Sequence, residues 1–107
     1  MRKGLARMAT LTIVYWRNIP AQVIVKAGRR SAKRQLSERF EQGIDRAAMK
    51  TGAAGTDDYL ADWRRENIGE IDADDLDAAA QAEADRLEAR YDREALKALI
   101  EAGGREG

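Results

Sequence analysis

The chain has 107 residues, of which 44% are hydrophobic and 36% are charged, and this composition indicates one small, charge-rich folded domain. It contains no cysteine and no histidine, which excludes disulfides, thiolate metal sites and the commonest general base of enzymes. The net charge is zero and no apolar run is long enough to span a membrane, so we expect a cytoplasmic protein.

The charges are divided unevenly between the two halves of the chain. Residues 1–50 hold 12 Lys and Arg against 3 Asp and Glu, a net charge of +9, whereas residues 51–107 hold 7 against 16, a net charge of −9. This asymmetry indicates either a surface for an anionic partner or two halves that neutralise each other on folding. Both interpretations stay open, because the layout of the charges in space decides between them.

The first elements predicted are two strands of an antiparallel hairpin. Thr10–Trp16 (TLTIVYW) is rich in β-branched and aromatic residues, and Ala21–Lys26 (AQVIVK) has a similar composition. The turn between them contains Pro20 and is too short for a parallel crossover. Residues 1–9 are expected to be a flexible tail, and Gly28 is expected to end the second strand.

Two helices are predicted after the hairpin. The first begins after Ser37 and runs to about Lys50, with apolar residues at i, i+4, i+7 and i+8 counted from Phe40. The second begins after Thr56, and its apolar face is expected to include Trp63.

The acidic second half predicts two more helices. Residues 67–71 are expected to form either a loop, which is favoured, or a short edge strand. The run Asp72–Asp75 is expected to cap a third helix that ends near Tyr91. Asp92 is expected to begin the fourth helix, and residues 103–107 to form a flexible tail.

These elements predict an α+β fold in a single domain over residues 10–102. Its N-terminal antiparallel hairpin is packed by helices and its C-terminal half is helical, in the order β-β-α-α-α-α. A two-stranded hairpin is only marginally stable alone, so the first two helices are expected to cover one face. The other face needs the third helix, a further strand or a second chain, and for this reason a homodimer is predicted.

A dense group of cations follows the second strand, in the segment Lys26–Arg34 (KAGRRSAKR). Arginine forks suit phosphate and carboxylate groups, and a glycine lets backbone amides approach an anion. The alternative is that these side chains are solvated or pair with the acidic second half. The predicted anion-binding or partner-binding residues are Lys26, Gly28, Arg29, Arg30, Lys33 and Arg34.

Aromatic residues stand beside arginines at two other places. Trp16 and Arg17 end the first strand, and Trp63 and Arg64 are predicted to end the second helix. Aromatic and guanidinium groups stack on bases and flat ligands, so these residues are predicted to form an aromatic-arginine rim. The alternative is that the aromatic rings belong to the core and the arginines to its polar edge.

No sequence pattern indicates catalysis, a cofactor or a metal. A nucleophile elbow, a dinucleotide-binding fingerprint and a metal-ligand cluster are all absent. The acidic run near Asp72 does not match a calcium loop, because Leu76 and Asp77 occupy positions that need an oxygen ligand and a glycine. We therefore predict no catalytic residue and no cofactor, and an enzyme is not favoured.

Two short segments resemble a known family. With Ile19–Val23 (IPAQV) and Asp45–Met49 (DRAAM), the chain resembles the small bacterial "virulence factor" domain over roughly residues 10–91. The resemblance implies neither a reaction nor catalytic residues, because the family has no established ones. It also implies an association with folate- and cobalamin-dependent one-carbon metabolism.

Together these observations favour a non-catalytic interaction or accessory module. Its basic segment is expected to bind an acidic protein partner or a phosphate-bearing ligand, and no membrane partner is expected. One alternative is a nucleic-acid-binding protein that uses the same segment. The other is a small subunit or ligand binder of folate- and cobalamin-dependent one-carbon metabolism.

Overall fold

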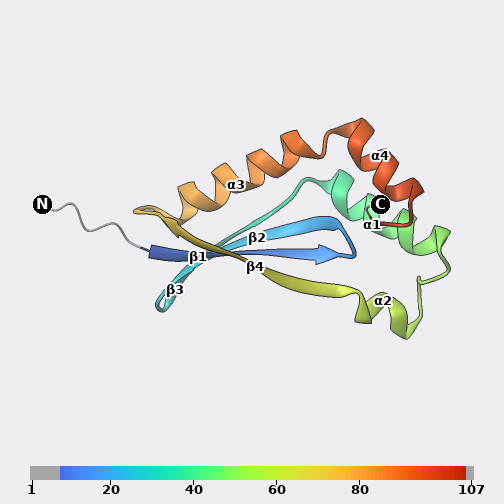
Figure 1. Cartoon of the computed structure of the whole chain (residues 1–107), viewed down its shortest axis with the longest axis horizontal. Coiled ribbons are helices and arrows are strands. Elements are labelled where there is room, and N and C mark those ends of the chain that lie inside the picture. The colour runs from blue at the N-terminus through green and yellow to red at the C-terminus, as the bar shows by residue number, and fades with distance from the viewer. Residues whose placement is uncertain (1–7, 106–107) are drawn as a thin grey trace, which may run out of the picture.

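The computed structural model describes residues 8–105, which form a four-stranded antiparallel sheet with four helices (Figure 1). The strands lie in the order β3-β2-β1-β4, so β1 and β2 are central. In chain order the elements are β1 (Met8–Trp16), β2 (Ile19–Ala27), β3 (Arg30–Gln35), α1 (Glu38–Lys50), α2 (Asp57–Ala61), β4 (Trp63–Asp72), α3 (Leu76–Arg90) and α4 (Arg93–Glu101).

The central strands confirm the α+β class and the predicted N-terminal hairpin. Leu11 lies opposite Val25 and Ile13 lies opposite Val23, and all four side chains are buried. Directly opposed residues of an antiparallel pair share a face of the sheet, so these residues define its buried face.

The third helix, α3, covers this buried face by lying across β2 and β3. Its buried side chains recur at helical spacing as predicted, and the small ones let the helix approach the sheet closely. The prediction that the first two helices pack on the hairpin is right only for α1, which contacts β2 as well as α4, whereas α2 lies against β4. The buried residues of α3 are Leu76, Ala80, Ala84 and Leu87.

The basic segment after β2 forms a strand, β3, that the predicted order β-β-α-α-α-α lacks. Ala32 pairs with Val25, and Lys33 pairs with Ile24. The sequence of β3, RSAKRQ, has no β-branched residue, so local propensity does not predict a strand. Its extended conformation follows instead from pairing with the edge of β2.

A second strand missing from the prediction is β4. The helix α2 ends at Ala61, and Trp63, which was expected on its apolar face, begins β4. Residues 67–71 belong to β4 and pair with β1, so the predicted loop is wrong. Ile68 has no partner in the register and forms a bulge, which interrupts the alternation that would identify a strand.

The acidic residues predicted to cap the third and fourth helices do so. Asp75 caps α3 and Asp92 caps α4, each by accepting a hydrogen bond from the backbone N–H three residues later. Ser37 precedes α1 as predicted, but its hydroxyl donates to Glu88 Oε1 of α3 (2.8 Å) and does not cap the helix. This hydrogen bond joins the start of α1 to α3.

The inner ends of both predicted tails belong to the fold. Met8 and Ala9 are the first residues of β1, and Gly103 and Gly104 are buried after α4. Asn18 N–H donates to the carbonyl of Gly104 (2.6 Å), which joins the β1–β2 turn to the end of α4. Arg105 is also described, and the rest of the two tails, residues 1–7 and 106–107, lies outside the described residues. No helix in residues 8–105 has the length and apolar composition needed to cross a membrane.

Candidate anion-binding surface

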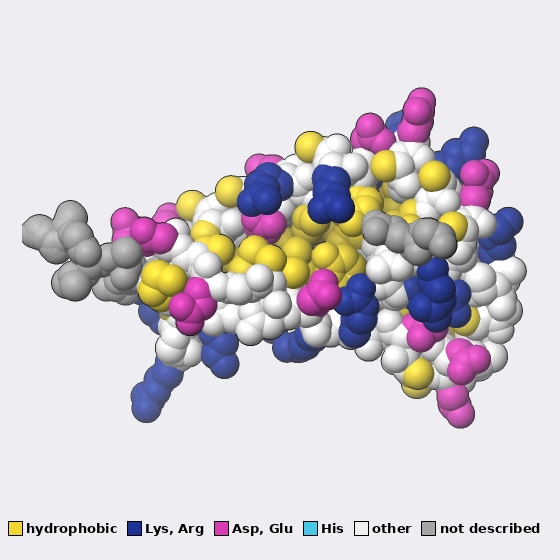
Figure 2. Space-filling view, in the orientation of Figure 1, with side chains coloured by type: hydrophobic (Ala, Val, Ile, Leu, Met, Phe, Trp, Pro, Cys, Tyr) yellow, Lys and Arg dark blue, Asp and Glu magenta, His cyan; other side chains and the backbone are white. Residues whose placement is uncertain are grey.

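The predicted cations lie on the hairpin formed by β2 and β3. Gly28, in the turn, has φ +60°, a conformation that favours glycine, and no atom lies within 4 Å of where its Cβ would stand. The backbone of the turn is therefore open to an approaching group. Figure 2 shows Lys and Arg side chains standing out at the end of the molecule where Figure 1 places this turn.

The strand register divides the cations between the two faces of the sheet. Lys26 pairs with Ser31 and Lys33 pairs with Ile24, so both lysines lie on the face opposite α3. Arg30 and Arg34 alternate with them and lie on the α3 face. The basic segment therefore projects charge to both sides of an edge strand.

Among the five cations of the basic segment, Arg34 is the one that contacts an acidic residue of the second half within residues 8–105. Its guanidinium lies 3.4 Å from the carboxylate of Asp77 and donates to Gln81 Oε1 (3.1 Å), both on α3. The other four cations are exposed, and none has an ion pair within 4 Å in the described part of the chain. These four residues, called the basic hairpin from here on, are Lys26, Arg29, Arg30 and Lys33.

The sheet face opposite α3 extends this surface across all four strands. Apart from Ile24 and the buried pair Trp16–Ile19 at the end away from the basic hairpin, its paired side chains are exposed or half-buried and mostly polar. Apart from Lys26 and Lys33, the sequence did not point to these residues, because their common face depends on β3 and β4, and recognising those two strands would have identified the face. The polar members are Thr10, Thr12, Gln22, Lys26, Ser31, Lys33, Gln35, Arg65, Asn67, Glu70 and Asp72.

The predicted aromatic-arginine rim lies away from the basic hairpin. Trp16 pairs with Ile19 at the start of β2, whereas the β2–β3 turn follows the end of that strand. At about 3.4 Å per residue, the nine residues of β2 separate the two places by roughly 25 Å. The structure therefore does not bring the two predicted sets together.

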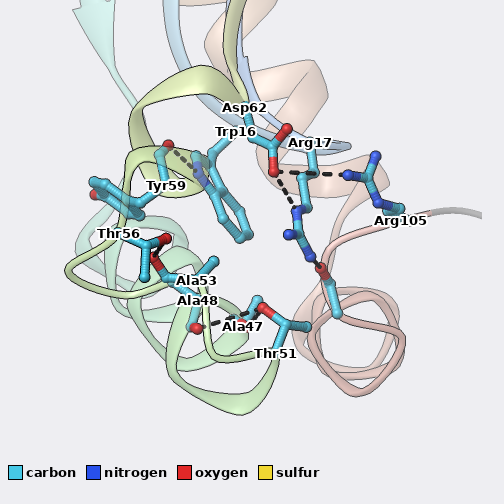
Figure 3. Close-up of polar contacts among 11 residues, drawn as sticks. Trp16, Arg17, Ala47, Ala48, Thr51, Ala53, Thr56, Tyr59, Asp62 and Arg105 are labelled. Atoms are coloured by element: carbon cyan, nitrogen blue, oxygen red, sulfur yellow. Dashed lines mark hydrogen bonds and ion pairs between the residues drawn. The ribbon is translucent and has the colours of Figure 1, made fainter.

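Trp16 and Arg17 hold three chain segments together (Figure 3). The indole of Trp16 is fully buried and donates from Nε1 to the carbonyl of Tyr59 (2.9 Å). Arg17 stacks on this indole and donates from Nε to Asp62 (2.9 Å) and from Nη1 to the Gly103 carbonyl (2.8 Å). Burial leaves Trp16 no surface for a ligand, which corrects the expectation of an exposed rim at this residue.

Trp63 and Arg64 belong to neighbouring aromatic contacts at the start of β4. Trp63 is half-buried and meets Tyr59 edge-on, with 6.1 Å between ring centroids. The Arg64 guanidinium lies 4.5 Å from the ring centroid of Tyr15. Burial, followed by the nearby Tyr91 and Glu66, raises the pKa of Tyr15 above its usual 10.0, so this phenol stays neutral at physiological pH.

The described residues contain no group of three or more carboxylates placed to hold a metal ion. The acidic run before α3 serves the helix instead, because the Asp75 carboxylate accepts the Ala78 N–H (3.1 Å).

Comparison with known proteins gives one match. A family model with the description "Virulence factor" matches residues 14–100, which include the last three residues of β1 and every later element except the last residue of α4. No curated protein and no solved structure matches the chain.

Proposed function

We propose that this chain, which belongs to the virulence factor family, is a non-catalytic module whose basic hairpin binds an acidic protein partner. The proposal rests on one observation. Four clustered cations are exposed and form no ion pair with a described carboxylate, although the chain has equal numbers of acidic and basic residues. Fixed positive charge on a rigid hairpin attracts acidic surfaces and orients them on approach.

The polar sheet face beside the basic hairpin supports a protein partner. Threonine and glutamine side chains there can donate and accept hydrogen bonds, as the rim of a protein interface requires. Proteins that bind single-stranded nucleic acid combine cations with aromatic stacking platforms. The aromatic residues described on this face, Trp16 and Trp63, are buried and half-buried respectively and lie at the end of the sheet away from the basic hairpin, so a nucleic-acid partner is the less favoured alternative.

The remaining alternatives stay predictions. The homodimer was expected because one face of a two-stranded hairpin needed cover, and the sheet instead has four strands with a mostly polar outer face. That reason for a dimer is therefore removed. The role in one-carbon metabolism still depends on the family resemblance alone.

Affinity capture from the native host tests the proposal. The wild type is compared with K26Q/R29Q/R30Q/K33Q and with a matched control, R46Q/K50Q/R93Q/K97Q, which removes four exposed cations from α1 and α4. We expect a protein partner that the wild type and the control capture equally and that the hairpin variant loses by about tenfold or more, the equivalent of roughly 1.4 kcal/mol.

Nuclease treatment of the lysate separates the two classes of partner. Capture that survives nuclease supports a protein partner, whereas capture that nuclease abolishes supports the nucleic-acid alternative. Equal capture by the hairpin variant and the wild type would contradict the proposed surface. Circular dichroism of each variant checks that the fold is retained.

A further inference from the structure

A second cationic site lies between α1 and α4, away from the basic hairpin. The two helices pack against each other beyond the end of the sheet, whereas the β2–β3 turn lies at the opposite end of the molecule (Figure 1). Between them is a groove of about 460 Å³. Pockets for small molecules usually have volumes of about 300–1,000 Å³, so the groove has the size of a small-ligand site.

The floor of the groove is apolar because Gly43 lets the two helices approach closely. A Cβ at this position would stand 3.0 Å from Ile100 Cδ1 and 3.5 Å from Leu96 Cδ1. Leu96 is buried, whereas Ile100 is half-buried and faces the groove. This floor offers contact to the apolar body of a ligand.

Four cations surround this floor, and helical spacing places them there. Arg39 and Arg46 are seven residues apart on α1, and Arg93 and Lys97 are four residues apart on α4, so each pair lies on one side of its helix. One carboxylate, that of Glu101, also lines the groove. The charge around the groove is therefore strongly positive.

Three of the four cations are available to a ligand. Arg39 is held by the Tyr91 carbonyl (2.6 Å) and the Glu88 carboxylate (3.0 Å). Arg46, Arg93 and Lys97 are exposed, and none makes an ion pair within 4 Å with another described residue.

We propose that the α1–α4 groove binds a small amphiphilic anion, with an aromatic or aliphatic body and a carboxylate, sulfonate or phosphate group. The body lies on Leu96 and Ile100, and the anionic group is held by the three available cations. Glu101 opposes the anion and limits its affinity. This site is independent of the proposed partner surface, because no residue belongs to both.

Titration with 8-anilinonaphthalene-1-sulfonate tests the site, because this probe has an apolar ring system and one sulfonate and fluoresces in apolar surroundings. The variants are R46Q/R93Q/K97Q and, as a control with the same number of charges removed, K26Q/R29Q/K33Q. We expect the groove variant to bind at least about tenfold more weakly than the wild type and the control to bind as tightly as the wild type.

A variant that is expected to bind the probe more tightly distinguishes a lost site from a misfolded protein. E101Q removes the carboxylate, so it is expected to bind the probe about threefold more tightly while its melting temperature and near-ultraviolet circular dichroism stay those of the wild type. The uncharged probe N-phenyl-1-naphthylamine should bind all of these proteins equally. Three outcomes would each overturn the proposal, whatever the capture experiment finds. The groove variant could bind the sulfonate probe as tightly as the wild type, the hairpin control could lose binding of this probe, or the wild type could show no saturable binding.

Discussion

Arg17 shows how one side chain can connect segments that are distant in the sequence. It has φ +56° in the β1–β2 turn, a left-handed conformation that is uncommon outside glycine. Its guanidinium bonds Asp62 before β4 and the Gly103 carbonyl after α4, which are 45 and 86 residues away. The sequence identifies Arg17 as a cation beside an aromatic residue, but such distant partners leave no local pattern that would predict them.

Replacing Arg17 by Ala is expected to lower the free energy of unfolding by about 2 kcal/mol, because a largely buried charge-assisted hydrogen bond is lost. Asp62 would keep only Arg105, at 3.6 Å, as a partner. The matched change Arg34→Ala removes an exposed ion pair and should cost less than about 1 kcal/mol. Urea unfolding followed by circular dichroism measures both, and equal losses would contradict a structural role for Arg17.

The elements that could be predicted are those whose own residues carry the pattern. β1 and β2 have β-branched and apolar residues, and the buried residues of α1 and α3 recur at helical spacing. β3 and β4 could not be predicted, because β3 is polar and charged and β4 is interrupted by a bulge at Ile68. The sequence predicts that the cations of the basic hairpin are clustered. It does not predict that Arg34 pairs with Asp77 while the other four form no ion pair with a described residue, because that contact depends on the position of α3.

The contact between α1 and α4 depends on Gly43. Gly43→Val is expected to destabilise the fold by about 1–3 kcal/mol, because the added methyl groups press on Ile100 and Leu96 and force the helices apart. Asp45→Val, at an exposed position of the same helix, is the control for helix propensity. Thermal and urea unfolding compare the two variants. A G43V protein as stable as the wild type would show that the close approach is not needed.

At the scale of the whole molecule, the two oppositely charged halves neutralise each other only in part. Within residues 8–105, three ion pairs join a cation of the first half to a carboxylate of the second, at Arg17–Asp62, Arg34–Asp77 and Arg39–Glu88. Each lies where a helix or turn of one half packs on the other. The basic hairpin extends beyond these contacts, so its positive charge faces solvent.

An NMR titration of the ¹⁵N-labelled wild type with a synthetic oligoglutamate peptide at low salt tests most directly whether the basic hairpin binds an acidic partner. We expect amide shifts to change in a saturable way from Lys26 to Lys33 and at neighbouring positions of the polar sheet face, and added salt to reverse them. Changes centred on α1 and α4, or no change around the basic hairpin, would contradict the claim that this hairpin receives an acidic partner.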